Sequence, residues 1–351
     1  MQSSSKDSKS MPSIAKKGNS YVKTLAKYLD GTQMFFLLFT IPFVVGAPYF
    51  LYTVYEVVER QKAMRPDYVG PYWPDFLWLI ITLPSISFGK YLTYLVMSGV
   101  YERRLPAKYT GDVRKLKIHK GCDNVFKVIY FIGISIYGYF AVIVKLPFDS
   151  PMLGNGTWKE YYAEYPYGLF MRASTYYCML NLSYHTESMI TMIFWPRMDF
   201  YEMLCHHVCT FLVISCSYIQ NYSNQCVLTM IVIDNGDIFI GLIRVFLDIS
   251  KSTTVITLAY AGMMISFFYT RIILYPTQIV MHGCLGNLDK LTDRLFPHYC
   301  ITTMMFTLGI LNFYWFALMI RMGYRFYAGY SPPTDMQCDE TKFASNKQKN
   351  E

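Results

Sequence analysis

Long apolar blocks, separated by short polar stretches, alternate along most of this chain. A helix needs about 20 apolar residues to cross about 30 Å of hydrocarbon. Eight blocks reach that length, at about 33–55, 75–99, 124–145, 170–195, 201–221, 225–247, 253–281 and 299–322. The pattern predicts an all-α polytopic membrane helix bundle of about eight transmembrane helices, or of seven if one block does not span the bilayer.

Two of the blocks contain residues that disturb an apolar helix. The second block is the weakest, because Lys90 interrupts it and Pro84 and Gly89 favour a bend. The seventh block is long, and we expect it to kink near Pro276. No internal repeat and no long soluble segment occur, so we expect one membrane domain between polar tails at 1–32 and 323–351.

The composition agrees with a membrane protein. The 351 residues are 53% hydrophobic and only 16% charged, which leaves too little polar surface for a soluble domain of this length. The 32 tyrosines and 25 phenylalanines are typical of rings that line membrane interfaces. The basic residues behind the net charge of +8 lie in the tails and in one loop, as the positive-inside rule predicts for a membrane protein. We therefore expect no nucleic-acid partner.

The basic residues also predict the orientation of the chain. They gather in the N-terminal tail, in the loop after the second block and in the C-terminal tail. An even number of spans puts these three regions on one side, which the positive-inside rule makes the cytosol. Both termini are therefore predicted to be cytosolic, with the sequon at Asn155 in the lumen as the predicted glycosylation site. The polar start lacks a cleavable-signal pattern, so the first block is expected to act as an uncleaved anchor.

Ionisable side chains lie inside two consecutive blocks. His206 and His207 fall in the fifth block, and Asp234 and Asp237 fall in the sixth. Such groups are costly at membrane depth and by default mark a functional site, although polar residues can also simply join helices. The two aspartates share a helix face, and Gly236 between them permits close approach of a backbone or a substrate. The two adjacent imidazoles differ in direction by about 100°, so one can face a cavity while the other meets a neighbouring helix.

An imidazole with a carboxylate partner points to acid–base or nucleophilic chemistry. The carboxylate fixes the tautomer and raises the basicity of the far nitrogen. Such a base can take a proton from an amine or hydroxyl that attacks an acyl carbonyl. Alternatively, one imidazole can itself accept the acyl group and pass it on. The residues leave both routes open.

The cysteines suggest no metal or disulfide framework. Nine are scattered along the chain without a Cys-x-x-Cys pair, so neither a zinc ribbon nor a redox dithiol is supported. Cys205, His206 and Cys209 have a helical spacing that could hold zinc, but both cysteines suit packing equally well. We expect no metal.

The site region resembles the ceramide synthases of the TLC-domain family. Residues 197–207 read Arg-Met-Asp-Phe-Tyr-Glu-Met-Leu-Cys-His-His, which is similar to that family's basic-Asp-Phe-x-Glu-Met-x-x-His-His segment. The stretch from Asp234 to Asp237 matches the Asp-x-x-Asp that follows, and Thr270, Arg271 and Pro276 match a later Thr-Arg…Pro element. The resemblance covers roughly residues 100–322, which would be the catalytic TLC-type domain after N-terminal helices at 33–99.

The resemblance implies N-acylation of a long-chain sphingoid base by a fatty acyl-CoA in the endoplasmic reticulum membrane. His206, His207, Asp234 and Asp237 would form the catalytic set, in a helix bundle that encloses an apolar tunnel. No cofactor is implied beyond acyl-CoA as co-substrate. The implied partners are acyl-CoA, the sphingoid base and membrane lipid, with a homo-oligomer or a small accessory subunit left open.

The chain departs from the family in a few places. Ile233 and His185 stand where the family often has His and Trp. The acidic end of the family's last luminal loop is associated with acyl length and is only partly matched, by Asp289 and Asp293. The acyl length therefore stays open.

Three further residues are predicted to bind substrate. His185, in the fourth block, lines the cavity or makes a structural hydrogen bond. Arg271, in the seventh, pairs with a carboxylate such as Asp237 or meets the phosphates of CoA. Arg244 follows Asp237 on the same face and, with Arg197 and Lys251, could attract the polyanionic CoA.

Two other functions compete with acyl transfer. A metal-dependent lipid desaturase or hydroxylase needs several His-x-x-His-type boxes, which six histidines in this arrangement cannot supply. A non-enzymatic TLC-domain relative, such as a lipid sensor, transporter or translocation accessory protein, would need no His/Asp centre. A transporter would more typically show inverted repeats.

Overall fold

The computed structural model describes residues 31–107, 109–153, 156–194, 199–250, 252–288 and 295–328. Every regular element in these ranges is helical, which confirms the predicted all-α class. The long elements are α2 (Gly31–Met64), α3 (Leu79–Arg104), α4 (Gly111–Ala141), α6 (Arg172–Phe194), α7 (Phe200–Ile219), α8 (Ser223–Ile249), α9 (Thr253–Phe267), the π-helix η4 (Phe268–Leu285) and α10 (Leu295–Tyr327). Short elements are η1 (Trp73–Trp78), η2 (Ile143–Lys145), η3 (Pro151–Leu153) and α5 (Trp158–Tyr161).

Some predictions concern residues outside these ranges. Most of the two tails lies there, and so do five individual residues named above: Asn155, Arg197, Lys251, Asp289 and Asp293. The predicted glycosylation site and part of the basic cluster expected near CoA therefore stay predictions.

Seven helical segments in the described chain are long and apolar enough to cross a membrane. They are Gln33–Met64, Trp73–Arg104, Gly111–Lys145, Phe200–Ile219, Ser223–Leu247, Thr253–Leu285 and Phe296–Arg325. The remaining predicted block forms α6, a helix of 23 residues that packs against α3, α7 and α8. It carries buried polar residues such as Asn181 and Glu187, which are tolerated at membrane depth because they face the bundle interior.

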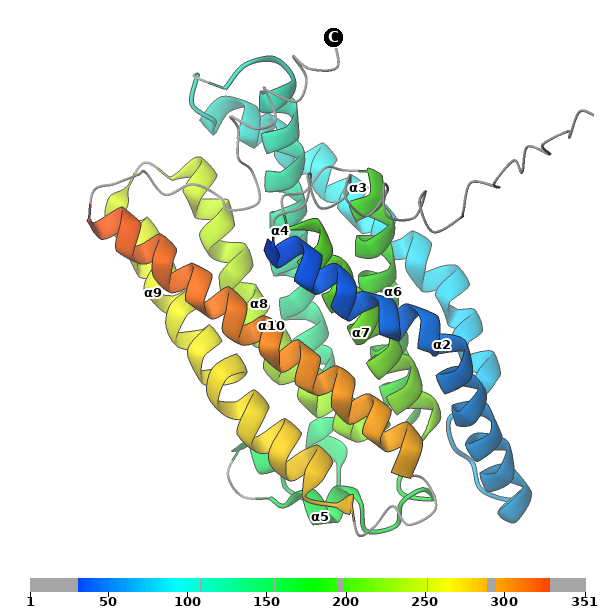
Figure 1. Ribbon diagram of the computed structural model, residues 1–351. Coiled ribbons are helices and arrows are strands. Elements are labelled where there is room, and N and C mark those ends of the chain that lie inside the picture. The colour runs from blue at the N-terminus through cyan, green and yellow to red at the C-terminus, as the bar shows by residue number, and fades with distance from the viewer. Residues whose placement is uncertain are drawn as a thin grey trace, which may run out of the picture.

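The two helices with the predicted site residues lie inside the bundle. Helix α8 packs against α4 and α9, and α7 packs against α2, α6 and α10. Figure 1 shows α2 and α10 crossing the near face of the bundle, with α7 and α8 behind them. These two are the most buried of the seven membrane-capable segments. Side chains on α7 and α8 can therefore meet in a region that is shielded from lipid.

An ion-pair network explains how Lys90 is tolerated within the second block. Lys90 on α3 pairs with Asp123 on α4 at 3.2 Å and with Glu187 on α6. Lys127 contacts the same Asp123 at 2.8 Å. A charge at membrane depth is tolerated when it is paired inside the bundle. The network ties three helices together two residues from His185 on α6.

The seventh block changes helix type part-way along its length. The chain is α-helical to Phe267 and π-helical from Phe268 to Leu285, so Pro276 lies within the π-helical part. Pro276 lacks a backbone N–H to donate, and π-helical segments often occur at functional sites. In this protein the π-helix carries the buried residues Arg271 and Tyr275.

Candidate active site

A single elongated cavity connects most of the predicted site residues. Its walls come mainly from α7, α8, η4 and α10. Its polar part is lined by His185, His206, Asp234, Asp237, Arg271 and Asn312. Along α8 the lining runs from Cys226 to Asp237, eleven residues or about 16 Å. The cavity therefore resembles the predicted apolar tunnel, because it is long and its ionisable groups lie together in one part.

Aromatic residues line the opposite part of the cavity, at one end of the bundle. Trp158 from α5 and Tyr162 after it are both buried and line the cavity. The ring of His298 on α10 is hydrogen-bonded to the Cys284 carbonyl of η4, with 2.8 Å between Nε2 and the oxygen. Figure 1 shows α5, the end of η4 and the start of α10 together at this end.

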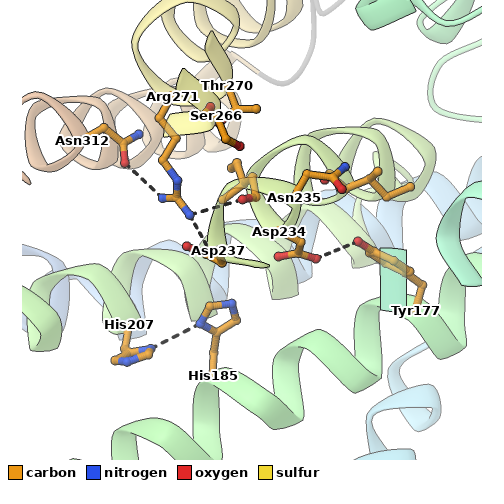
Figure 2. A network of polar contacts seen from close by, with 12 residues as sticks. Tyr177, His185, His207, Asp234, Asn235, Asp237, Ser266, Thr270, Arg271 and Asn312 are labelled. Carbon is orange, nitrogen blue, oxygen red and sulfur yellow. Dashed lines mark hydrogen bonds and ion pairs between the residues drawn. The ribbon is translucent and has the colours of Figure 1, made fainter. Parts of the chain in front are cut away.

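The two adjacent histidines of α7 have different surroundings. His206 lines the cavity and packs its ring edge-on against Trp315 of α10, with ring centroids 5.4 Å apart. His207 is buried and turns toward α6, where its Nδ1 lies 3.3 Å from Nδ1 of His185 (Figure 2). This is the division predicted from the helical rotation: one imidazole faces the cavity and the other meets a neighbouring helix. His185 is buried and both lines the cavity and contacts His207.

The two aspartates of α8 have different partners. Asp234 is almost fully buried and accepts a hydrogen bond of 3.1 Å from the Tyr177 hydroxyl of α6. Asp237 accepts a hydrogen bond of 2.7 Å from Arg271 of η4 (Figure 2). Both carboxylates line the cavity together with His206, so one bound molecule can contact the imidazole and the acids.

Arg271 of η4 is held by residues of two other helices, α8 and α10. Besides Asp237, its guanidinium donates to the Asn312 side chain of α10 at 3.2 Å and to the Ile233 carbonyl of α8 at 3.4 Å. Of the two roles predicted for this cation, pairing with a carboxylate is the one that the structure shows.

Gly236 lies where α8 meets Thr270 and Arg271 of η4. A Cβ atom at this position would lie 3.1 Å from the Thr270 hydroxyl and 3.5 Å from Nε of Arg271. The absence of a side chain therefore lets η4 approach α8 closely, as the sequence predicted for a backbone or a substrate. A larger residue would press Arg271 away from Asp237.

Other candidates lie apart from the cavity. Arg244 is seven residues beyond Asp237 on α8, and it is not among the described residues that line the cavity. Cys205 and Cys209 are fully buried in the hydrophobic core, again away from the described lining. The zinc set of these cysteines with His206, considered from their spacing, is thus not supported.

The sequence reasoning missed two residues that hold the polar groups in place. Asn312 is an isolated amide in the last apolar block, and the cost of a polar group at membrane depth could have identified it. Tyr177 carries no comparable signal, because tyrosine is frequent throughout the chain.

Comparisons with known proteins identify the family of the chain. A family model described as the TLC domain matches residues 120–321. Ceramide synthase LOH2 from Arabidopsis thaliana is 22% identical over 253 residues, which cover 70% of this chain and 81% of that protein. Ceramide synthase 1 LOH3 from the same plant is 22% identical over 294 residues, 76% of this chain and 91% of that protein. Ceramide synthase 4 from Bos taurus is 22% identical over 228 residues, 65% of this chain and 56% of its own length.

The matched region contains all the helices that build the polar part of the cavity. It spans more than half of the chain and lies within the 100–322 region predicted from the motifs. The chain belongs to the TLC-domain family, and the relatives that it resembles include ceramide synthases.

Proposed function

We propose that this protein is a ceramide synthase, which transfers a fatty acyl group from acyl-CoA to the amine of a long-chain sphingoid base in the endoplasmic reticulum membrane. One observation carries the proposal: His206, Asp234 and Asp237 meet in one largely apolar cavity inside a membrane bundle. Family membership and the ceramide synthases among its relatives support the same reaction.

The reaction can be followed atom by atom. The amine nitrogen attacks the thioester carbonyl carbon, a C–N bond forms and the C–S bond breaks. His206, the imidazole that faces the cavity, accepts the amine proton and returns a proton to the departing thiolate of CoA. In the alternative route, His206 first takes the acyl group as an acyl-imidazole, which the amine then attacks. Both routes use the same cavity-facing nitrogen.

The surrounding residues prepare this imidazole for proton transfer. Arg271 offsets the charge of Asp237, while Asp234, held by Tyr177, lies on the same face of α8 one turn away. Inside the bundle, these groups act on a developing imidazolium more strongly than they would in bulk solvent. The remaining apolar lining, with Ile279 and Leu308 among its members, provides a surface for hydrocarbon chains.

The direct test is turnover by the purified protein. We expect incubation with a sphingoid base and a panel of acyl-CoAs to yield the N-acylated base and free CoA in equal amounts, detected by mass spectrometry and a thiol assay. Reactions without the base provide the control for simple thioester hydrolysis. A folded preparation that binds either lipid but forms no product with any acyl-CoA would favour the alternative, a non-enzymatic lipid sensor, transporter or translocation accessory protein.

The aromatic end of the cavity, lined by Trp158 and Tyr162, leads to a prediction about acyl length. The indole of Trp158 lies against Gly283, whose Cβ position is 3.4 Å from the ring, so it bounds the space available to a chain. Trp158→Ala is expected to raise kcat/KM for longer acyl-CoAs by about tenfold or more, relative to kcat/KM for the acyl length that the wild type prefers. Product masses from a graded acyl-CoA panel give the measurement.

Trp158→Phe is the matched control, because it keeps an aromatic ring at the end of the cavity. It should keep a profile close to that of the wild type. If Trp158→Ala leaves the acyl profile unchanged, or shifts only the preferred length of the sphingoid base, the acyl chain does not end at Trp158.

A further inference from the structure

A third imidazole joins the His206–His207 pair in the described structure. His185 comes from α6, whereas His206 and His207 lie on α7. One ring nitrogen from each of His185, His206 and His207 lies within 4.8 Å of those of the other two. His185 and His207 are buried, and His206 borders the cavity. Three imidazoles have thus gathered at one point inside a membrane protein, where each polar group is costly.

The geometry of the three rings suits a tetrahedral metal ion. Two nitrogens bound to zinc at about 2.0–2.1 Å with tetrahedral angles lie roughly 3.3 Å apart, and the Nδ1 atoms of His185 and His207 are 3.3 Å apart. The ring centroids form a nearly regular triangle with sides of 5.8, 5.5 and 5.2 Å. The three ring nitrogens that could bind an ion lie within 4.8 Å of one another.

The surroundings also suit a cation with one open coordination position. Because His206 lines the cavity, the fourth position of such an ion would face the cavity, as in zinc sites with three protein ligands. Asp234 and Asp237 line the same cavity, and Arg271 offsets only one of these two carboxylates. Carboxyl oxygens therefore border the same space as the fourth position of such an ion.

We propose that His185, His206 and His207 form a binding site for a zinc-class divalent ion, and that the bound ion inhibits acyl transfer. The inhibitory part rests on the proposed function. An imidazole nitrogen that coordinates a metal has committed its lone pair, so it can neither accept the amine proton nor attack the thioester.

Metal binding is tested without reference to activity. Full-length protein in detergent micelles, stripped with a chelator, is loaded with zinc, desalted and analysed for metal content, and a parallel sample is titrated with cobalt. We expect about one zinc ion per chain and a cobalt spectrum typical of tetrahedral coordination. His185→Phe and His185→Gln should each weaken binding by about tenfold or more. Two variants are made so that the test can be carried out even if one of them does not fold. Thermal melting shows which variants are folded.

His282→Ala is the control, since this histidine lies outside the cluster and its ring is hydrogen-bonded to the Thr277 carbonyl of η4. It should bind zinc like the wild type. Substoichiometric zinc in the wild type, or unchanged binding in both folded His185 variants, overturns the site.

The inhibitory part is tested by adding zinc to the acyl-transfer assay. Zinc should inhibit the wild type, a chelator should restore the rate, and the inhibition constant should rise by about tenfold or more in the His185 variants on the activity that they retain. If the stripped protein is inactive and zinc activates it, the inhibitory role is wrong. If zinc binds stoichiometrically to a protein without acyl-transfer activity, the proposed function fails while the metal site stands.

Discussion

Acyl transfer in microsomes is expected to fall by about 10²–10⁴-fold when either His206 or Asp234 is replaced by alanine. His206→Ala removes the imidazole that faces the cavity, and with it the proton acceptor of either proposed route. Asp234→Ala removes a buried carboxylate that lines the same cavity and is oriented by Tyr177. The measurement is the rate of N-acylated base formation, at matched protein level and with chelator present so that metal binding does not contribute.

The control for both variants lies on α8, next to Asp234. Asn235 is exposed, and its side chain donates only to the Ile231 carbonyl one turn back at 2.9 Å among the hydrogen bonds of the described chain. Asn235→Ala should therefore retain a rate near that of the wild type. Tyr177→Phe is expected to cause an intermediate loss, because it keeps the ring but removes the hydrogen bond to Asp234. Wild-type rates in both alanine variants would mean that the chemistry does not take place at this centre.

The helices themselves were predictable because their cause is local. Each long apolar block forms a helix, since a backbone in lipid must satisfy its own hydrogen bonds. Even α6, which is too polar to qualify as a span by hydropathy, was present in the pattern as a block. The same reasoning identified His206, His207, Asp234 and Asp237, because ionisable groups at membrane depth stand out in any sequence.

The relations between helices were not predictable, because they depend on packing register. Helical rotation separates His206 from His207, but only the position of α7 against α6 and α10 decides which ring faces the cavity. The partner of Arg271 stayed open for the same reason. Lys90 looked like a defect in a span, since its partners Asp123 and Glu187 belong to other helices. Periodicity along one segment carries no information about the distance to another.

The ion pair between Arg271 and Asp237 gives the largest expected effect on stability. Arg271→Met removes the cation and leaves the Asp237 carboxylate without its charge partner inside the bundle. Breaking a buried pair in this way typically costs about 3–5 kcal/mol. Asn312 and the Ile233 carbonyl lose a donor as well. We expect the midpoint of thermal unfolding in detergent to fall by roughly 10 °C at a fixed scan rate.

Removing both charges separates the structural role of the pair from its chemical role. Replacing a buried ion pair by apolar side chains is often neutral for stability, so Arg271→Met combined with Asp237→Leu should recover most of the lost melting temperature. The double variant should nevertheless stay inactive, because Asp237 belongs to the proposed catalytic set and lines the cavity beside His206. A double variant as unstable as Arg271→Met alone would show that Arg271 stabilises the bundle through Asn312 and the α8 backbone instead. A stable double variant with wild-type turnover would remove Asp237 from the chemistry and leave it a purely structural partner of Arg271.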